Sequence, residues 1–146
     1  MIVSEENTTF VVLIQQMMLI DHVALYCQDL EAMRDFFITY FEASSNDLYH
    51  NQSTGLRTYI LSFPKGDTRL ELMQRPDVTS QVVPERAHLG YIHLSMAVGS
   101  KMQVDAMTSR LQAEGYHVLS GPRTTGDGYY ESCIEGPEKI LIEITV

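Results

Sequence analysis

The fold is decided by residues 20–41, IDHVALYCQDLEAMRDFFITYF, together with residues 91–112, YIHLSMAVGSKMQVDAMTSRLQ, because the second stretch repeats the pattern of the first. In each copy a His is followed seven residues later by a residue type that begins helices, Asp29 or Ser100. Apolar residues then recur at helical spacing, and Ser100 with Gln103 has the spacing of a capping box. Self-similarity on this scale predicts two copies of one supersecondary unit.

The two copies also end alike. RLELM (69–73) and LIEIT (141–145) both alternate apolar residues with one central glutamate, Glu71 or Glu143. Each copy has room for two further strands between its helix and its final strand, near 46–48 and 58–63 in the first and at 117–120 and 129–134 in the second. The segment GPRTTGDG (121–128) is typical of a turn. The chain therefore predicts an α+β fold of two tandem βαβββ modules, with one curved mixed sheet and the helices on its outer face.

The repeat also predicts the domain organisation. Module one takes residues 18–75, and module two takes residues 89–146, within a single domain. A connector of residues 76–88 with two prolines joins them. Residues 1–17 are expected to be an N-terminal extension outside this domain.

Composition excludes several classes of function. The chain has 146 residues, of which 45% are hydrophobic, enough for one domain with a core. Its formal net charge of -9 disfavours nucleic acids and anionic membrane surfaces. Residues 10–20 are apolar but shorter than a membrane span, and Gln15 and Gln16 interrupt them. The two cysteines are too few for a disulfide framework, so we expect a cytoplasmic protein with reduced thiols.

Strand alternation singles out four polar side chains. Each lies opposite the apolar face of its strand, as His22 lies opposite Val23 and Leu25. The four are His22, Glu71, His93 and Glu143. A lone His or Glu on a strand is more often merely solvated, but the equivalent places of these four in the repeat favour a common role. We expect a curved sheet to gather them in one concave pocket.

Two imidazoles and two carboxylates form a donor set for a divalent metal ion. Neutral histidine supplies nitrogen ligands of intermediate softness, and the two carboxylates neutralise the charge of the ion. The set suits one ion per site, namely Ni²⁺, Zn²⁺, Co²⁺, Mn²⁺ or Fe²⁺, with positions left open for water or substrate.

Four strings in residues 19–146 carry a resemblance to a known family. They are IDHVALYCQDLEAMRDFF, RLELM, HLGYIHLSMAVGS and GPRTTGDGYYESCIEGPEKILIEITV. The chain resembles the vicinal oxygen chelate superfamily of glyoxalases, bleomycin-resistance proteins and extradiol dioxygenases, and within it the small bacterial glyoxalase I-like proteins. The resemblance implies a homodimeric lactoylglutathione lyase-type enzyme that isomerises the hemithioacetal of a 2-oxoaldehyde through an ene-diolate. It also implies that Glu143, or as second choice Glu71, moves the proton.

The substrate end of the site departs from the glyoxalase I pattern. Tyr26 stands four residues after the first His, where the family has an Arg, and Arg75 stands four residues after the first Glu, where it has an Asn. The expected substrate contacts are Tyr26, Arg75, Arg123 and Tyr129. Three alternatives stay open: a CoA-ester epimerase, a dioxygenase, and a non-catalytic small-molecule binding or resistance protein.

Overall fold

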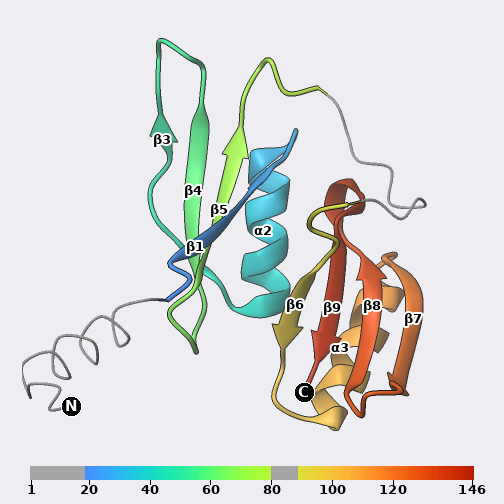
Figure 1. Cartoon of the computed structure of the whole chain (residues 1–146). Coiled ribbons are helices and arrows are strands. Elements are labelled where there is room, and N and C mark those ends of the chain that lie inside the picture. The colour runs from blue at the N-terminus through green and yellow to red at the C-terminus, as the bar shows by residue number, and fades with distance from the viewer. Residues whose placement is uncertain (1–18, 80–88) are drawn as a thin grey trace, which may run out of the picture.

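The computed structural model describes residues 19–79 and 89–146, which form two modules lying side by side (Figure 1). The first module contains β1 (His22–Tyr26), α2 (Leu30–Phe41), β2 (Ser44–Ser45), β3 (Tyr49–His50), β4 (Arg57–Ser62) and β5 (Arg69–Gln74). The second contains β6 (Leu94–Ala97), α3 (Lys101–Ala113), β7 (His117–Thr124), β8 (Tyr130–Glu135), the 3-10 turn η1 (Pro137–Lys139) and β9 (Leu141–Thr145). The predicted α+β fold with two modules is confirmed. The predicted extension 1–17 and residues 80–88 of the connector lie outside the described residues.

Each module builds its own mixed sheet, so the strands of one chain form two sheets rather than one. The strand orders are β1-β5-β4-β2, with β3 also on β4, and β6-β9-β8-β7. The first strand of each module runs parallel to the last, and the other pairs are antiparallel. Within the described residues, β1 and β6 each pair on one side only, which leaves an open edge on each sheet.

Two predicted segments differ from the structure. The segment near 46–48, expected to be a strand, is instead the link between β2 and β3. The Asn46 side chain there replaces a backbone acceptor in the hydrogen bonding with β4. Its Oδ1 accepts a hydrogen bond from the Ile60 N–H at 2.7 Å. The first half of the turn expected at 121–128 belongs to a strand, since β7 continues to Thr124. A Cβ on Gly121 would lie 2.5 Å from the Glu131 carbonyl oxygen, so this close approach requires glycine.

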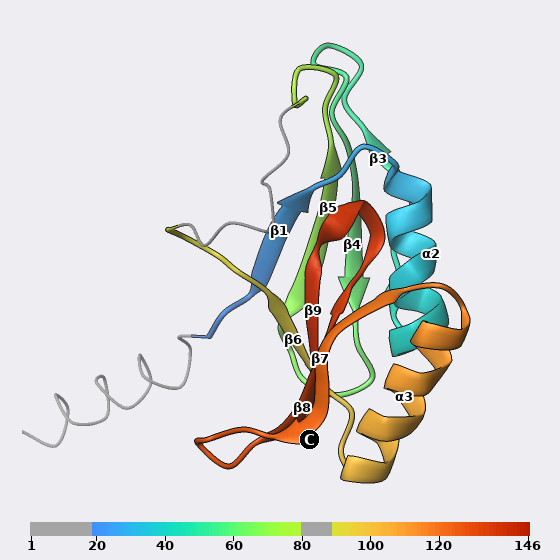
Figure 2. The ribbon, with the colours of Figure 1, turned by 90° about the vertical axis from the view of Figure 1, so that its right-hand side faces the viewer.

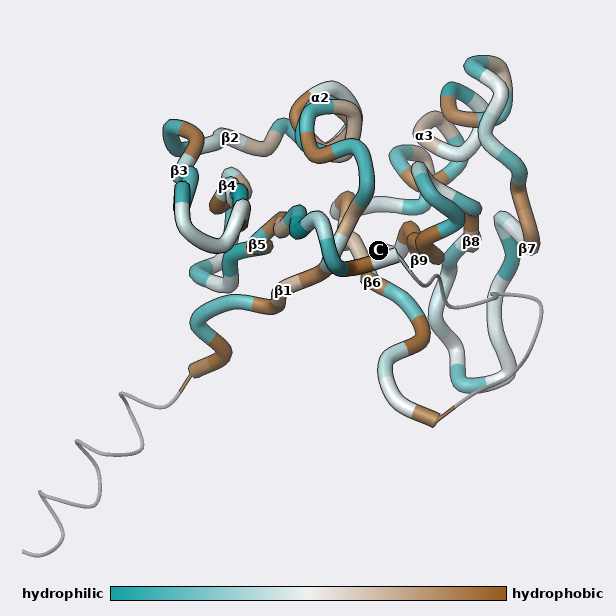
Figure 3. Tube along the Cα trace, turned by 90° about the horizontal axis from the view of Figure 1, so that it is seen from above, coloured by the Kyte–Doolittle hydropathy of each residue, from teal (hydrophilic) through white to brown (hydrophobic). Residues whose placement is uncertain are grey.

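Both helices begin at the predicted caps. The Asp29 side chain accepts from the Ala32 N–H at 2.9 Å, and the Ser100 hydroxyl accepts from the Gln103 N–H at 3.2 Å. Figures 2 and 3 show α2 and α3 along the same side of the molecule. Their apolar faces cover the sheets and form one core with them. Its fully buried side chains include Leu30, Met33, Phe37, Leu61, Leu72, Val104, Leu111, Ile134, Ile142 and Ile144. None of the described helices is long and apolar enough to span a bilayer.

The β8–β9 turn of module two caps the helix of module one. Glu138 stands in the left-handed region at φ 52° and directs its carboxylate toward the start of α2. That carboxylate accepts hydrogen bonds from the N–H of Gln28 at 2.8 Å and of Asp29 at 2.7 Å. A negative charge at a helix N-terminus also interacts favourably with the helix dipole. This contact fixes the end of β1 relative to module two.

Removing this carboxylate is expected to weaken the junction between the modules. Glu138→Ala leaves two N–H groups at the start of α2 without their acceptor, and should lower the free energy of unfolding by about 1–2 kcal/mol. Urea denaturation measures the change. Glu135→Ala is the control, because the Glu135 side chain makes no hydrogen bond within the described residues. Equal stability of the two variants would show that the Glu138 carboxylate does not stabilise the junction between the modules.

A second junction joins the ends of the two helices. The Tyr40 hydroxyl donates to the Glu114 carboxylate, and the Arg110 guanidinium lies 4.8 Å from the centre of the Tyr40 ring. The Tyr116 ring packs against Phe36 at a centroid distance of 5.2 Å. The Tyr40 hydrogen bond, followed by Arg110, lowers the pKa of Glu114, whereas burial and then Glu114 raise the pKa of Tyr40 to about 12.

The lowered pKa of Glu114 predicts an acid-dependent stability. Its carboxylate stabilises the folded chain above the ordinary pKa of 4.5, and this contribution is lost as the pH falls through the lower folded value. The urea midpoint of the wild-type protein should therefore fall more between pH 6 and pH 3 than that of Glu114→Gln. Parallel curves for the two proteins would show that this contact does not contribute.

Candidate metal centre

His22 and Glu71 form the first of two matching pairs, called half-site one here. They lie on the parallel neighbours β1 and β5, where Ala24 is the register partner of Glu71. The distance from His22 Nε2 to Glu71 Oε2 is 3.7 Å. Both side chains lie on the face of the sheet opposite the core, as alternation predicts.

Asp21 orients the imidazole of half-site one. His22 Nδ1 lies 2.8 Å from Asp21 Oδ2, and Arg69 pairs with the same carboxylate. The hydrogen bond from His22, followed by that from Arg69, lowers the pKa of Asp21. An imidazole that donates this hydrogen bond from Nδ1 has the lone pair of Nε2 on the side of Glu71, free to bind an ion. A carboxylate behind a histidine is the usual support for a metal ligand.

His93 and Glu143 form half-site two, at the equivalent place in module two. The distance from His93 Nε2 to Glu143 Oε2 is 3.6 Å. Glu143 lies on β9 beside β6, and the Ser95 hydroxyl donates to Glu143 Oε1 at 2.6 Å. In half-site two the supporting group, Ser95, holds the carboxylate, whereas in half-site one the supporting group, Asp21, holds the histidine. The repeat is symmetric in the four main residues but not in the groups behind them.

Two further side chains from β8 lie on the ligand face of half-site two. Cys133 is the register partner of Glu143, and Glu131 lies two residues earlier on the same face. Burial, and then the nearby charge of Glu143, raises the pKa of Glu131. Burial, followed by the same carboxylate, raises the pKa of the Cys133 thiol. Cys133 is therefore a neutral thiol rather than a nucleophilic thiolate at neutral pH.

The donors of each half-site fit a divalent ion. Neighbouring donors around an ion with bonds of about 2.1 Å lie roughly 3.0–3.4 Å apart, so 3.6 and 3.7 Å are close to a coordination edge and too long for hydrogen bonds. The carboxylates of Glu71 and Glu143 are 21% and 19% exposed, and the two histidines are more open. Each half-site is therefore reachable and only partly desolvated.

The single chain brings the four residues together in pairs and not as one set. Across residues 19–79 and 89–146, no group of three His, Cys, Asp or Glu side chains is placed to hold an ion. The expectation that a curved sheet gathers all four in one pocket stays a prediction, and the described part of a single chain holds them as two separate pairs. The physical reason is that β1 and β6 do not pair with each other, so the two sheets stay separate.

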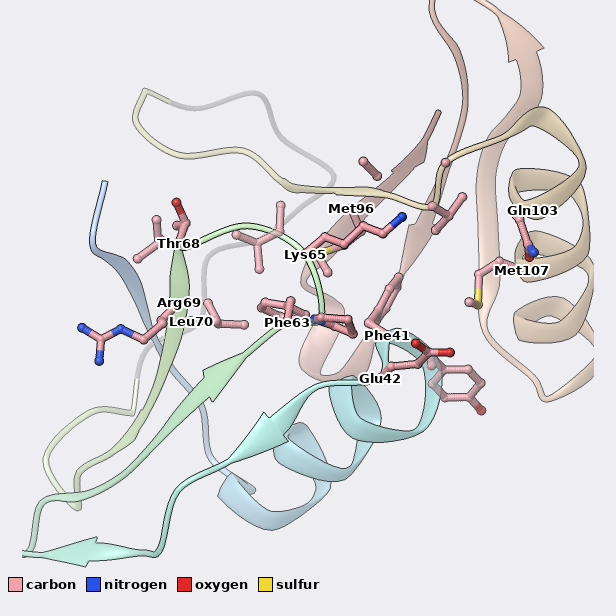
Figure 4. A pocket seen from close by; sticks show the side chains of 17 residues that line it. Phe41, Glu42, Phe63, Lys65, Thr68, Arg69, Leu70, Met96, Gln103 and Met107 are labelled. Atoms are coloured by element: carbon pink, nitrogen blue, oxygen red, sulfur yellow. The ribbon is translucent and has the colours of Figure 1, made fainter. Parts of the chain in front are cut away.

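A cavity between the modules does not include these residues. It has a volume of about 610 Å³ and lies against the core side of the sheets, where Figure 4 shows Phe63, Leu70 and Met96 around it. Lys65 and Gln103 also line it (Figure 4). None of the four ligand candidates lines this cavity.

The expected substrate contacts lie at different places. Tyr26 ends β1 and is 45% exposed. Arg75 follows β5 and pairs with Asp77 at 2.7 Å, so its guanidinium already has a carboxylate partner. Arg123 lies on β7 opposite Glu131. Tyr129 precedes β8 and is 61% exposed, while its neighbour Tyr130 packs against the core.

Sequence reasoning missed four residues that contact the ligand candidates or the expected substrate contacts. They are Asp21, Asp77, Ser95 and Glu131. Two of them had a local signal: Asp21 directly precedes a candidate ligand, and Ser95 lies two residues after another on the same strand face. The other two had none, because a turn places Asp77 and the pairing of β8 with β9 places Glu131.

The support from Asp21 leads to a prediction about metal affinity. Asp21→Asn removes the charged acceptor behind His22 and should weaken metal binding roughly 10- to 100-fold. Competition with a chromophoric chelator measures the affinity. Asp47→Asn is the matched control, since Asp47 is exposed and makes no ion pair within the described ranges. Equal affinities for the two variants would contradict the role of Asp21.

Comparison with known proteins gives consistent matches. A family model described as the Glyoxalase/Bleomycin resistance protein/Dioxygenase superfamily matches residues 19–144. The uncharacterized protein YqjT of Bacillus subtilis is 33% identical over 126 residues, which cover 84% of this chain and 94% of YqjT.

Solved structures show the same fold at low identity. The trypanothione-dependent glyoxalase I of Leishmania major aligns with a TM-score of 0.69 at 15% identity, covering 88% of this chain and 86% of that one. A fosfomycin resistance protein of Listeria monocytogenes aligns with a TM-score of 0.64 at 14% identity, covering 89% and 92%. These two neighbours have different names and one architecture, so function has to be argued from the site.

Proposed function

Because the chain belongs to the Glyoxalase/Bleomycin resistance protein/Dioxygenase superfamily, we propose that it is a metal-dependent lyase of the glyoxalase I type. Its substrate would be the hemithioacetal of a 2-oxoaldehyde and a thiol, and its product a 2-hydroxy thioester. The observation that carries the proposal is the pair of matching half-sites, in which an imidazole nitrogen and a carboxylate oxygen lie 3.7 Å apart in one and 3.6 Å apart in the other.

The proposal includes a homodimer, because each chain holds two halves of a site that do not meet. His22 lies on the edge strand β1 and His93 directly precedes the edge strand β6, while the two glutamates lie on the neighbouring strands β5 and β9. Exposed apolar side chains precede both edge strands. Ile20 is 66% and Tyr91 is 91% exposed. Exposed apolar groups beside unpaired strand edges favour burial against a second copy. In this arrangement half-site one of one protomer completes half-site two of the other, which gives two sites per dimer.

His22, Glu71, His93 and Glu143 would hold the ion. When bound, a divalent ion supplies Lewis-acid polarisation of the two neighbouring oxygens of the substrate and stabilises the charge of the ene-diolate. Glu143 takes the proton from the carbon that bears sulfur and returns it to the adjacent carbon, so no other reactant is needed. The Ser95 hydroxyl donates to Glu143 Oε1 at 2.6 Å, so Oε2, which faces His93 at 3.6 Å, is the oxygen that would both contact the ion and exchange the proton.

The test is turnover by the full-length chain loaded separately with Ni²⁺, Zn²⁺, Co²⁺, Mn²⁺ and Fe²⁺. Methylglyoxal is first equilibrated with one of several low-molecular-weight thiols, and formation of the thioester is followed by its ultraviolet absorbance. The proposal expects metal-dependent thioester formation with at least one thiol. Absence of turnover with every metal and thiol would overturn it. Proton exchange into a methylmalonyl-type thioester would instead indicate an epimerase. Oxygen consumption with a catechol would indicate a dioxygenase. Stoichiometric ligand binding without turnover would indicate a resistance-type binding protein.

A further inference from the structure

The cavity between the modules is built from both of them. Its volume of about 610 Å³ lies within the range of small-molecule sites, whereas a protein interior normally leaves few spaces larger than a water molecule. The helices α2 and α3 and the strands β5 and β6 all contribute to it (Figure 4). Its apolar lining includes Val23, Phe41, Phe63, Leu70, Met96 and Met107. A space of this size and lining suits the apolar body of a small molecule.

This cavity is separate from the two half-sites. Val23 and Leu94 line it, and they directly follow His22 and His93 in the chain. Alternation along a strand places such neighbours on opposite faces. A molecule in the cavity would therefore lie behind the two histidines, on the other face of the sheets, and would not meet the ligand candidates.

Exposed polar side chains mark the place where the cavity opens to solvent. Lys65 and Thr68, from the turn between β4 and β5, and Gln103, near the start of α3, are all exposed and all line it. The Lys65 side chain extends across the lining toward Met96 (Figure 4). Its four-carbon stem covers apolar surface while its ammonium stays at the opening. Within the described residues, Lys65 makes no ion pair.

The other charged side chains of the lining are less suited to hold an anion. Arg69 pairs with Asp21, and its guanidinium points away from the cavity in Figure 4. Glu42 is the one carboxylate in the lining, and it lies beside Phe41 at the end of α2 rather than beside Lys65 (Figure 4). The net charge of -9 acts at longer range, where salt screens it. Lys65 is thus the cation of the lining that is available to a ligand.

We propose that this cavity is a second ligand site, which takes a small molecule with an apolar body and one carboxylate, such as a medium-chain fatty acid or an aromatic acid. The body lies among Phe63, Met96 and Met107, and the carboxylate pairs with Lys65. Burial of the body supplies most of the affinity, while the ion pair sets the orientation and selects a carboxylate. The site needs no metal ion, so the inference does not depend on the proposed function.

The test compares three eight-carbon probes, octanoate, octanamide and octylamine, which differ in the charge of the polar end. Each is titrated calorimetrically into the full-length, metal-free protein, because a bound metal ion would offer the carboxylate another site. Octanoate should bind at least about threefold more tightly than octanamide. Lys65→Met keeps an apolar stem without the charge and should close that gap. Lys101→Met is the matched control, since Lys101 lies over the Tyr130 ring and does not line the cavity.

A second variant tests the location. Gln103 is exposed on α3, so Gln103→Trp should fold, and its indole would fill part of the opening. Octanoate binding should weaken on the order of tenfold. Circular dichroism checks the fold of each variant. A parallel titration with 2-naphthoate assigns the body of the ligand, because tighter binding than octanoate supports an aromatic acid and weaker binding supports a fatty acid.

Every other result counts against the site. Equal binding of octanoate and octanamide overturns the inference, as does tighter binding of octylamine, which would assign the selection of charge to Glu42. A gap that Lys65→Met leaves intact, octanoate binding that Gln103→Trp leaves unchanged, or no binding by any probe also overturns it. If no probe binds and Gln103→Trp separates a dimer, the cavity belongs to the contact with a second copy. Octanoate binding without isomerase turnover supports this inference and contradicts the proposed function.

Discussion

Glu143→Gln is expected to lower the turnover number of metal-saturated protein by roughly 10²- to 10⁴-fold, the usual contribution of a positioned acid–base group. The amide keeps the size of the side chain and a coordinating oxygen, but it cannot accept the substrate proton. Glu143 is preferred over Glu71 because the Ser95 hydroxyl holds one of its oxygens and Glu131 lies beside it. The rate is measured at saturating substrate, with metal content determined on the same samples.

Glu71→Gln is the matched comparison. It changes the same group at the equivalent position, so it should weaken metal binding but, once the ion is supplied in excess, should retain more turnover than Glu143→Gln. A larger loss of turnover in Glu71→Gln would mean that Glu71, rather than Glu143, transfers the proton. Unchanged metal content and turnover in both variants would exclude both glutamates from the site.

Two inactive chains are expected to restore activity when they form mixed dimers. One chain carries His22→Ala and Glu71→Ala, and the other carries His93→Ala and Glu143→Ala. Each alone lacks one half of every site and should be inactive. In the mixed dimer the intact half-site two of the first chain meets the intact half-site one of the second, which rebuilds one site of two. With random mixing the activity should reach on the order of a quarter of the wild-type value.

Refolding the two chains together, or co-expressing them with different tags, gives the mixed dimers for this measurement. The control mixes two preparations of the same double variant, which can rebuild no site. Activity that stays at the background level in the mixed dimer would mean that each chain completes its own site. Activity with the stoichiometry of one ion per mixed dimer would support shared sites.

Much of the fold follows from local pattern. The offset between His22 and His93 predicted two modules, and the caps at Asp29 and Ser100 are found at the start of α2 and α3. These features depend on residues close together in the chain, so periodicity and capping chemistry determine them. The errors near 46–48 and at 121–128 arose where a side chain or a neighbouring strand replaced the expected local structure.

Residue type and strand alternation are enough to identify the four ligand candidates and the face of the strand on which each lies, because alternation is a property of a single strand. The repeat in the sequence also pairs His22 with Glu71 and His93 with Glu143, because each pair belongs to one copy. The separation of these pairs in the described part of one chain follows from the packing of the modules, which leaves β1 and β6 unpaired with each other. The tertiary structure likewise decides that Asp77 holds Arg75 and that Glu131 stands beside Glu143, since contacts across turns and strands follow from register rather than from residue type.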